Sequence, residues 1–393
     1  MRWAPNDDAV HLAALVAAWL TSLGLGWLAW RTVETRLGSP RWPMRAAAFR
    51  CALALGKNAG QGVQTMKEMD SMQSLLQDCT GKLPVIVLGS GASAAHGIPG
   101  MDPLGKHLAA SILPATCQTE PHLAGWSDFL DKVQKMDLES ALTGVNVTPE
   151  VLEHIVHTTW QFLNTADFRI FEQVLADRRL LPLSQLFQHL LRSTAMELQV
   201  VTPNYDRLAE YAAEAAGYCA YTGFTFGMFG TRAVDVPRIH LGRRPARTVN
   251  VWKVHGSLGW FSGSDGSIVA LPPLGAVPSG FTPVIVTPGT EKYRRTHEEP
   301  FRSAMHSADD AVARASAFLC IGYGFNDDHL QPLMMERCTR PEVPLVLITK
   351  EISLTAHRFL KSGRCSRYVA LEEVPKWHAH VQPRSAGWPG TAR

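Results

Sequence analysis

The stretch KLPVIVLGSGASAAHGIPGMD, residues 82–102, decides the fold class. An apolar run from Val85 to Leu88 ends abruptly in Gly-Ser-Gly-Ala-Ser, and a second turn of small residues follows at 97–100. Glycines after a strand let backbone amides come close to a neighbouring group, such as the pyrophosphate of a dinucleotide. Glycine turns after strands are also common without any nucleotide, so this turn alone is a weak signal.

The rest of the chain alternates strand-like and helix-like segments, which predicts an α/β fold with a doubly wound, mainly parallel sheet. The predicted strands are short apolar runs, as expected where helices cover both faces of a sheet. They lie at 84–89, 198–202, 250–255, 283–287, 317–323 and 344–349. The predicted helices lie at 103–113, 149–164, 168–178, 182–197, 206–216, 298–315 and 327–339.

These segments divide the chain into an N-terminal extension (1–65), a main domain (66–375) with a helical insertion (101–197), and a polar tail (376–393). Residues 218–249 and 262–282 are rich in Gly, Pro and Thr and are predicted as surface loops.

The N-terminal extension contains an apolar segment, residues 9–30, that is long enough to span a bilayer. Four arginines follow it at 31, 36, 41 and 45, so an anchored chain would keep its main domain in the cytoplasm. Residues 66–76, MKEMDSMQSLL, read like a protein start, so 1–65 also fit a non-native extension. A buried helix is the third interpretation.

Composition excludes several function classes. The formal net charge is +3, but residues 1–62 hold seven Lys/Arg and three Asp/Glu. The remaining residues therefore have a formal net charge of −1 and lack the excess of basic residues that is typical of nucleic-acid-binding proteins. The seven cysteines include no CxxC pair. We therefore expect a reduced cytoplasmic protein with neither a disulfide framework nor a structural zinc site.

Three further predicted strands end in small or reactive residues. TPNYDRL (202–208) carries Asn204 and Asp206, VWKVHGSLGWF (251–261) carries His255 before a glycine, and CIGYGFNDDHL (320–330) follows the fourth strand. Parallel strands present their carboxyl ends at one edge of a sheet, where ligands bind. Each motif also has a structural interpretation: an aspartate can cap a helix, and a single histidine at a strand end is usually structural.

Together the four turns resemble the sirtuin family of NAD-dependent enzymes over about residues 82–350. The family pattern is Gly-Ala-Gly-x-Ser, Gly-Ile-Pro, Thr-Gln-Asn-x-Asp, His-Gly and a later glycine-rich turn. This chain has matching residues at 89–93, 97–99, 202–206, 255–256 and 322–324. The resemblance implies a Rossmann-like domain with NAD as its ligand.

The resemblance also implies roles for individual residues. Asn204 would orient the nicotinamide ribose and the attacking water, and Asp206 would contact the carboxamide or hold Asn204 in place. His255 would act as general base, which suits the ordinary pKa of histidine near 6.5. The expected NAD-binding residues are Gly89, Ser90, Gly91, Ala92, Ser93, Ile98, Pro99, Asp102, Gly256, Gly322, Tyr323 and Gly324.

Two departures from the deacylating sirtuins change the expected activity. Gly100-Met101-Asp102 stands where those enzymes have a Phe-Arg pair, and the four zinc-binding cysteines are missing from the sequence. We therefore expect no zinc and no zinc lobe, which forms one wall of the acyl-lysine cleft in those enzymes.

The TPNYD, IVTPGTEKY and CIGYGFNDDH stretches are similar to the sirtuin-like effectors of bacterial antiphage systems. That branch implies an NAD glycohydrolase, which releases nicotinamide and ADP-ribose and depletes the infected cell of NAD (abortive infection). It also implies a homo-oligomer, or a partner sensor such as a translocase-type ATPase, an Argonaute-like protein or a nucleotide-sensing domain.

Two other functions stay open at this point. One is a protein deacylase or ADP-ribosyltransferase that has lost its zinc, and the other is a non-catalytic module that binds NAD or ADP-ribose. The presence of Asn204, Asp206 and His255 together argues against the pure binding module, since glycine turns alone would suffice for binding.

Overall fold

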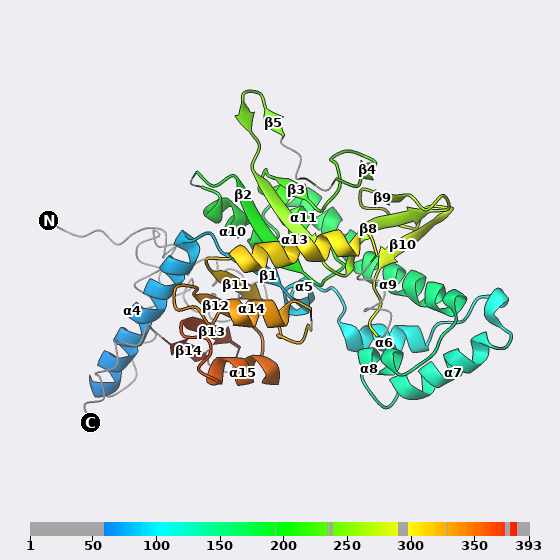
Figure 1. Cartoon of the computed structure of the whole chain (residues 1–393), viewed down its shortest axis with the longest axis horizontal. Helices are drawn as coiled ribbons and strands as arrows, with labels where there is room; N and C mark the ends of the chain where they lie inside the picture. The colour runs from blue at the N-terminus through cyan, green and yellow to red at the C-terminus, as the bar shows by residue number, and fades with distance from the viewer. Residues whose placement is uncertain are drawn as a thin grey trace, which may run out of the picture.

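The computed structural model describes residues 59–192, 194–233, 235, 239–289, 298–327, 329–373 and 378–382. Its centre is an eight-stranded sheet in the order β14-β13-β12-β11-β1-β2-β7-β3 (Figure 1). The strands are β1 (Val85–Leu88), β2 (Glu197–Thr202), β3 (Cys219–Tyr221), β7 (Thr248–Lys253), β11 (Phe318–Ile321), β12 (Leu345–Thr349), β13 (Tyr368–Glu372) and β14 (His378–Gln382). All pairings are parallel except that of β14 with β13. The predicted doubly wound, Rossmann-like sheet is confirmed.

Strand β1 lies at the point where the strand order reverses. The chain first adds β2, β3 and β7 on one side of β1, and later adds β11, β12 and β13 on the other. The register is continuous across this point: Val87 pairs with Val201 of β2 and with Cys320 of β11. In doubly wound sheets, ligands bind outside the carboxyl ends of the strands at such a reversal.

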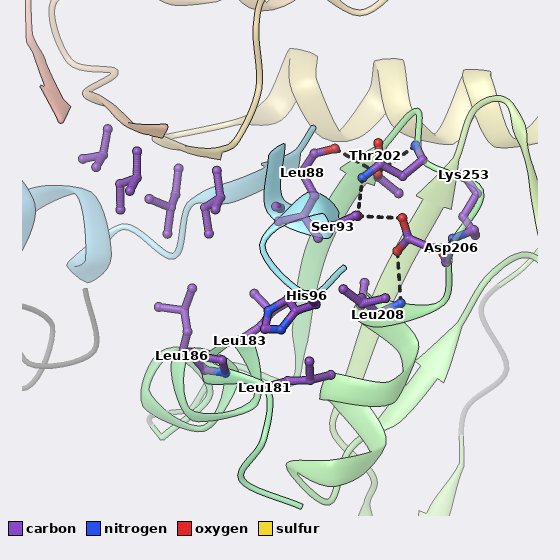
Figure 2. A pocket seen from close by; sticks show the side chains of 18 of the residues that line it. Leu88, Ser93, His96, Leu181, Leu183, Leu186, Thr202, Asp206, Leu208 and Lys253 are labelled. Carbon is purple, nitrogen blue, oxygen red and sulfur yellow. Dashed lines mark hydrogen bonds between the residues drawn. The ribbon is translucent and has the colours of Figure 1, made fainter. Parts of the chain in front are cut away.

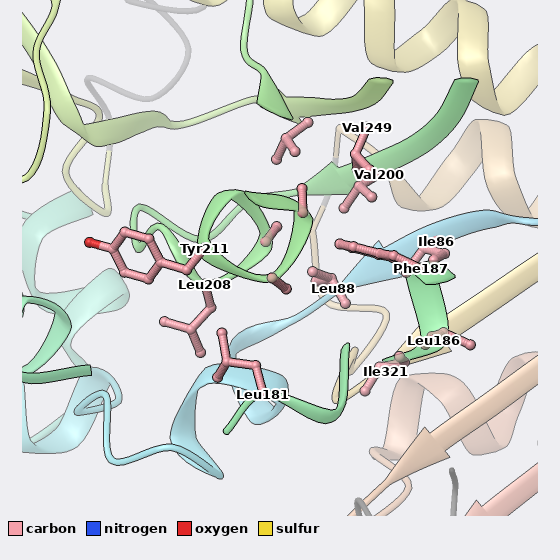
Figure 3. Close-up of a cluster of buried hydrophobic side chains, with 14 of the residues drawn as sticks. Ile86, Leu88, Leu181, Leu186, Phe187, Val200, Leu208, Tyr211, Val249 and Ile321 are labelled. Atoms are coloured by element: carbon pink, nitrogen blue, oxygen red, sulfur yellow. The ribbon is translucent and has the colours of Figure 1, made fainter. Parts of the chain in front are cut away.

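Both faces of the sheet are buried, as the apolar strand sequences predicted. Ile86 and Leu88 point into a core shared with α10 (Pro182–Leu190) and α11 (Leu208–Ala215), part of which Figure 3 shows. The alternate residues Val85 and Val87 point into a second core. That second core includes residues of α13 (Phe301–Arg314), α14 (Gln331–Arg337) and α15 (Leu354–Lys361).

Between β1 and β2 the chain is helical. This segment comprises α5 (Ser90–Ala94), α6 (Met101–Ala109), α7 (His122–Val133), α8 (Leu138–Thr143), α9 (Pro149–Ala176) and α10. Helices α6, α7 and α8 and the first turns of α9 share a separate small core that includes Leu104, Phe129 and Ile155. They form a lobe at one end of the molecule (Figure 1).

Helix α9 is one continuous helix, whereas the sequence predicted two, at 149–164 and 168–178. Thr148 caps its first turn by accepting from the Val151 amide, and Pro149 occupies the first turn, where proline is tolerated. Asn164 and Asp167, at the gap between the two predicted helices, are polar residues that are buried. They point toward the start of α11, so tertiary contacts explain their position inside the helix.

A second, smaller sheet in the order β10-β8-β9-β4 takes up part of the segments predicted as loops. Its strands are β4 (Gly230–Thr231), β8 (Gly256–Gly263), β9 (Ile268–Ala270) and β10 (Phe281–Ile285). The predicted strand at 283–287 therefore belongs to this antiparallel sheet and not to the central one. The Trp160 indole of α9 donates to the Leu258 carbonyl at 2.9 Å and joins the small sheet to the insertion. A hairpin of β5 (His240–Leu241) and β6 (Arg244–Pro245) lies nearby in sequence.

The two ends of the described chain add elements that the sequence pattern missed. Helix α4 (Ala59–Gly81) runs across position 65/66, and α15, β13 and β14 lie beyond the last predicted strand. Among the helices of the described ranges, none combines the length and the apolar character needed to cross a bilayer. The apolar segment 9–30 lies outside the described residues.

Candidate active site at the carboxyl ends of the central strands

The glycine turn after β1 packs against a second glycine turn after β11. The Gly89 amide donates to the Ile321 carbonyl and the Gly91 amide to the Gly322 carbonyl, both at 3.0 Å. A Cβ on Gly89 would lie 2.3 Å from the Gly322 oxygen, and one on Gly322, whose φ is +58°, would lie 2.2 Å from the Ala92 nitrogen. The neighbour that excludes side chains here is therefore another backbone turn, where the sequence suggested a ligand. That these glycines also bind NAD stays a prediction.

Ser93 connects this turn to the residues after β2. The Asn204 side-chain amide donates to Ser93 Oγ at 2.8 Å and to the Gly89 carbonyl at 2.9 Å. Ser93 Oγ in turn donates to Asp206 Oδ2 at 2.6 Å (Figure 2). Both amide hydrogens of Asn204 are used in these contacts, so its side-chain oxygen is the atom available to accept from water or a ribose hydroxyl.

The backbone geometry after β2 follows from its polar residues. The Thr202 hydroxyl donates to the Leu88 carbonyl at 2.8 Å and accepts from the main-chain amide of Asn204 at 3.1 Å. These two contacts turn the chain back toward β1. Asp206 Oδ1 accepts from the Leu208 amide at 3.2 Å, where α11 begins. Asp206 thus serves the start of the helix with one oxygen, as its structural interpretation predicted, and the Ser93 hydroxyl with the other. Its functional role stays a prediction.

A buried lysine lies on the other side of Asp206. Lys253, the last residue of β7, is 1% exposed; its Nζ donates to the Asp206 main-chain carbonyl and lies 3.2 Å from Glu210 Oε1. Burial raises the pKa of the Asp206 carboxyl, while Lys253 and the Ser93 hydroxyl act in the opposite direction. Burial also raises the pKa of Glu210. Lys253 was not predicted as a site residue, although a charged residue at the end of the fully buried strand TVNVWK is an unusual feature that could have indicated it.

A second buried ion pair joins α9 to the start of α11. The Arg207 guanidinium lies 2.6 Å from Asp167 Oδ2, and the Arg207 amide donates to Asp167 Oδ1 at 2.7 Å. Arg207 also donates to Asn164 Oδ1 at 2.7 Å, and the Tyr211 hydroxyl donates to Asp167 Oδ2 at 2.6 Å. These contacts anchor the residue next to Asp206 and thereby hold the Asn204–Asp206 turn from the insertion side. No local sequence signal pairs residues 40 positions apart.

His255 follows β7 and faces the turn after β11. Its Nε2 lies 3.4 Å from Asp327 Oδ2, and both side chains are nearly buried. Asp327 Oδ1 accepts from the main-chain amides of His329 and Leu330 at 3.0 and 3.2 Å, so Asp327 caps the turn before α14. His255 is not among the residues that line the pocket described next.

A pocket of about 60 Å³ opens beside the Ser93–Asn204–Asp206 chain and extends under α10 toward α4 (Figure 2). Its polar lining consists of Thr80, Ser93, His96, Thr202, Asn204, Asp206 and Lys253. Its interior is apolar and includes Leu76, Leu181, Leu183, Leu186, Ile321 and Ile348. Burial lowers the pKa of His96, a lining residue that the sequence analysis missed. The pocket has room for a small ring or several waters, so a dinucleotide would have to lie mostly over the strand ends.

The other residues expected to bind NAD lie in varied surroundings. Ile98 is buried in the core on the α10 side of the sheet, and Tyr323 is buried in the core on the other side. Ser90 and Asp102 are exposed. Asp102 lies in the first turn of α6, where a carboxylate favours the positive end of the helix dipole.

Two other positions are fixed by backbone contacts. The Ser353 hydroxyl donates to the Gly324 carbonyl. Gly256 has a φ of +91°, and a Cβ there would lie 2.3 Å from the Val284 carbonyl oxygen of β10. Within the described ranges, no cluster of three or more His, Cys, Asp or Glu residues could hold a metal ion.

Comparison with known proteins supports the resemblance drawn from the motifs. Residues 198–362 match the family model described as SIR2-like domain, a segment that includes Asn204, Asp206 and His255 but not the turn after β1. No curated protein matches the chain significantly. The chain is sirtuin-like over the matched segment.

Solved structures of Sir2 homologues show a distant likeness. A Sir2 homologue in complex with NAD shares 15% identity over 75% of this chain and 86% of its own, with a TM-score of 0.38. A mutant Sir2 homologue in complex with ADP-ribose shares 15% identity over 72% of this chain and 87% of its own, with a TM-score of 0.39.

Proposed function

We propose that this sirtuin-like chain binds NAD and hydrolyses it to nicotinamide and ADP-ribose. One observation carries the proposal: the hydrogen-bonded chain Asn204–Ser93–Asp206 joins two strand ends at the reversal of strand order, beside a pocket. The histidine of the third motif follows the neighbouring strand β7. A module that only bound a nucleotide would not need these polar groups.

The reaction makes modest demands on the protein. The bond between nicotinamide and ribose breaks, nicotinamide leaves as a neutral base, and the ribose anomeric carbon becomes positive. A water oxygen forms the new bond to that carbon, and its proton passes to a base. The site must therefore orient the ribose and one water and stabilise a cation, which is mainly positioning and electrostatics.

We assign Asn204 to orient the ribose and the water through its side-chain oxygen, because its amide hydrogens are held by Ser93 and Gly89. Of the two roles expected for Asp206, its hydrogen bond to Ser93 supports the one in which it holds Asn204 in place. The third residue, His255, is proposed as the base, with Asp327 orienting its ring. The Gly89–Ser93 turn and Gly322 would lie against the dinucleotide.

We further propose that the hydrolase acts as an effector of bacterial antiphage defence. This rests on the resemblance of the motifs to that branch of sirtuin-like proteins. A constantly active NAD hydrolase would poison its own cell, so the activity requires an off state. Control by homo-oligomerisation or by a partner sensor would provide one.

The test is to incubate the full chain with NAD and separate the products by chromatography. We expect nicotinamide and free ADP-ribose in equal amounts, and a loss of about 10²–10⁴-fold in His255→Ala, the range for a general base. Asn204→Ala should lose activity to a similar extent. The matched controls are His240→Ala and Asn146→Ala, which remove exposed side chains away from the site.

Three results would count against the proposal. Full turnover by His255→Ala would remove the base assignment. Nicotinamide released only when an acyl-lysine peptide or an acceptor protein is added would indicate a deacylase or a transferase instead. Tight NAD binding without turnover at every oligomeric state, and in cells where the defence response is triggered, would indicate a binding module.

A further inference from the structure

Lys253 is an ionisable residue at the end of a fully buried central strand. All six residues of β7 are buried, and the lysine is 1% exposed. Removing an ammonium group from water is costly unless it is paired and hydrogen-bonded. A lysine is therefore not expected at the end of a central strand unless its charge has a task there.

The ammonium reaches the site from the side opposite Ser93. It donates to the main-chain carbonyl of Asp206 and pairs with Glu210 Oε1 at 3.2 Å. Lys253 also lines the same pocket as Ser93, Asn204 and Asp206 (Figure 2). Its charge thus lies against the backbone of the residue that holds Ser93 and favours the ionised form of that residue's carboxyl group.

We propose that Lys253 is a positioning residue of the NAD site: its ammonium fixes the Asn204–Asp206 turn and keeps the Asp206 carboxyl ionised, so that Ser93 stays oriented toward Asn204. The inference rests on the proposed NAD site. An ionised Asp206 can only accept from the Ser93 hydroxyl, which leaves the Ser93 oxygen as the acceptor for Asn204. A protonated Asp206 would donate to the Ser93 oxygen instead, and the Ser93 hydroxyl hydrogen would have to turn away from Asp206.

The charges around Asp206 make the ammonium decisive. Asp206 faces the Ser93 hydroxyl from α5, the ammonium of Lys253 from β7, Asp167 from α9 and Glu210 from α11. Burial, Asp167 and Glu210 oppose ionisation of Asp206, while the ammonium, the Ser93 hydroxyl and the Leu208 amide favour it. Loss of the ammonium therefore shifts the balance toward the neutral acid.

A purely structural role for Lys253 would make a different prediction. Glu210 is buried with it, and Glu210 Oε2 has no hydrogen-bond partner within the described residues. If the lysine served only to neutralise Glu210, removing both charges together would leave the site intact. Removing the lysine alone would not distinguish the two roles, because an unpaired buried Glu210 would destabilise the fold.

The experiment compares the full-length chain with the double variant Lys253→Met/Glu210→Gln and the single variant Glu210→Gln. Nicotinamide release and NAD affinity by calorimetry are measured across pH 5–8, and circular dichroism confirms folding. We expect kcat to fall about 10²-fold in the double variant, as for loss of a preorganised electrostatic contact, with KM changed far less. On the acidic side of the profile of activity against pH (the acid limb), we expect the activity of the double variant to fall at a higher pH than that of the parent chain. We expect the activity of Glu210→Gln to fall at a lower pH than that of the parent chain.

The outcomes separate this inference from the proposed function. If the double variant folds and matches the parent chain in kcat and in its acid limb, the positioning role is wrong. If the double variant does not fold, an acid limb of Glu210→Gln that does not move to lower pH overturns the inference. A parent chain that binds NAD but releases no nicotinamide refutes the hydrolase. Lys253 is then judged by NAD affinity: the positioning role is wrong if the affinity of the double variant depends on pH in the same way as that of the parent chain. A parent chain that binds no NAD refutes both.

Discussion

Replacing Ser93 by alanine tests the centre of the site, because one hydroxyl group connects the two strand-end turns. Its oxygen donates to Asp206 at 2.6 Å and accepts from Asn204 at 2.8 Å, and the residue is 4% exposed. Alanine is accommodated readily in helix α5, so backbone strain should not contribute. The variant removes one buried and one partly buried hydrogen bond and leaves their partners in place.

The expected loss follows from those partners. A hydrogen bond to a charged group contributes about 1.5–3 kcal/mol and an ordinary one about 1 kcal/mol, and a buried group without its partner adds a desolvation cost. We expect Ser93→Ala to lower the free energy of unfolding by about 2–3 kcal/mol. The hydroxyl lowers the pKa of Asp206, so its removal should also favour the neutral carboxyl.

The assay is urea unfolding followed by circular dichroism, together with nicotinamide release. We expect a loss of activity of about 10–10²-fold, since Asn204 would be held from one side only and small misplacements have effects of this size. Ser90→Ala, an exposed serine in the same helix, is the control for stability. A stability loss within about 0.5 kcal/mol of that control, the usual range for surface changes, would refute the reasoning.

Three other predictions follow from buried groups. Because burial lowers the pKa of His96 below its ordinary value of 6.5, the unfolded chain binds the proton more tightly. The free energy of unfolding should therefore fall as pH drops below about 6.5, with a smaller slope in His96→Gln, and equal slopes by urea titration at several pH values would contradict this. Gly322→Ala should cost about 2–4 kcal/mol or prevent folding, since its Cβ would lie 2.2 Å from the Ala92 nitrogen; an unchanged urea midpoint would show that the two turns separate readily. Arg207→Met should cost about 3–5 kcal/mol by leaving Asp167 unpaired, and the double variant with Asp167→Asn should recover part of that loss in the same assay; no recovery would mean that the arginine acts through packing.

Much of the central sheet could be predicted from local sequence. The apolar runs at Val85–Leu88 and Leu345–Thr349 are buried on both faces, and such runs are recognisable without knowledge of their neighbours. The candidate site could be placed for a related reason: residues that follow parallel strands meet at one edge of the sheet. Asn204 and Asp206 were identified in this way, and the structure brings both to Ser93.

The contacts that organise the site could not be predicted, because each joins residues far apart in the chain. Gly89 and Gly322 exclude one another's side chains across two turns, and nothing near either glycine in sequence identifies its neighbour. His255 lies against Asp327, and Lys253 turns its ammonium toward Asp206. A strand pattern predicts only that a residue is buried, not what it meets there.

The sequence by itself therefore determined the α/β class and the edge of the sheet where Asn204 and Asp206 meet Ser93. Only the tertiary structure decided which groups touch, which carboxyl group faces the buried ammonium, and that α9 runs unbroken past Asp167 to its partner Arg207. The physical reason is that periodicity and turn chemistry are local properties, whereas hydrogen bonding and ionisation in a buried site depend on neighbours that the fold brings together.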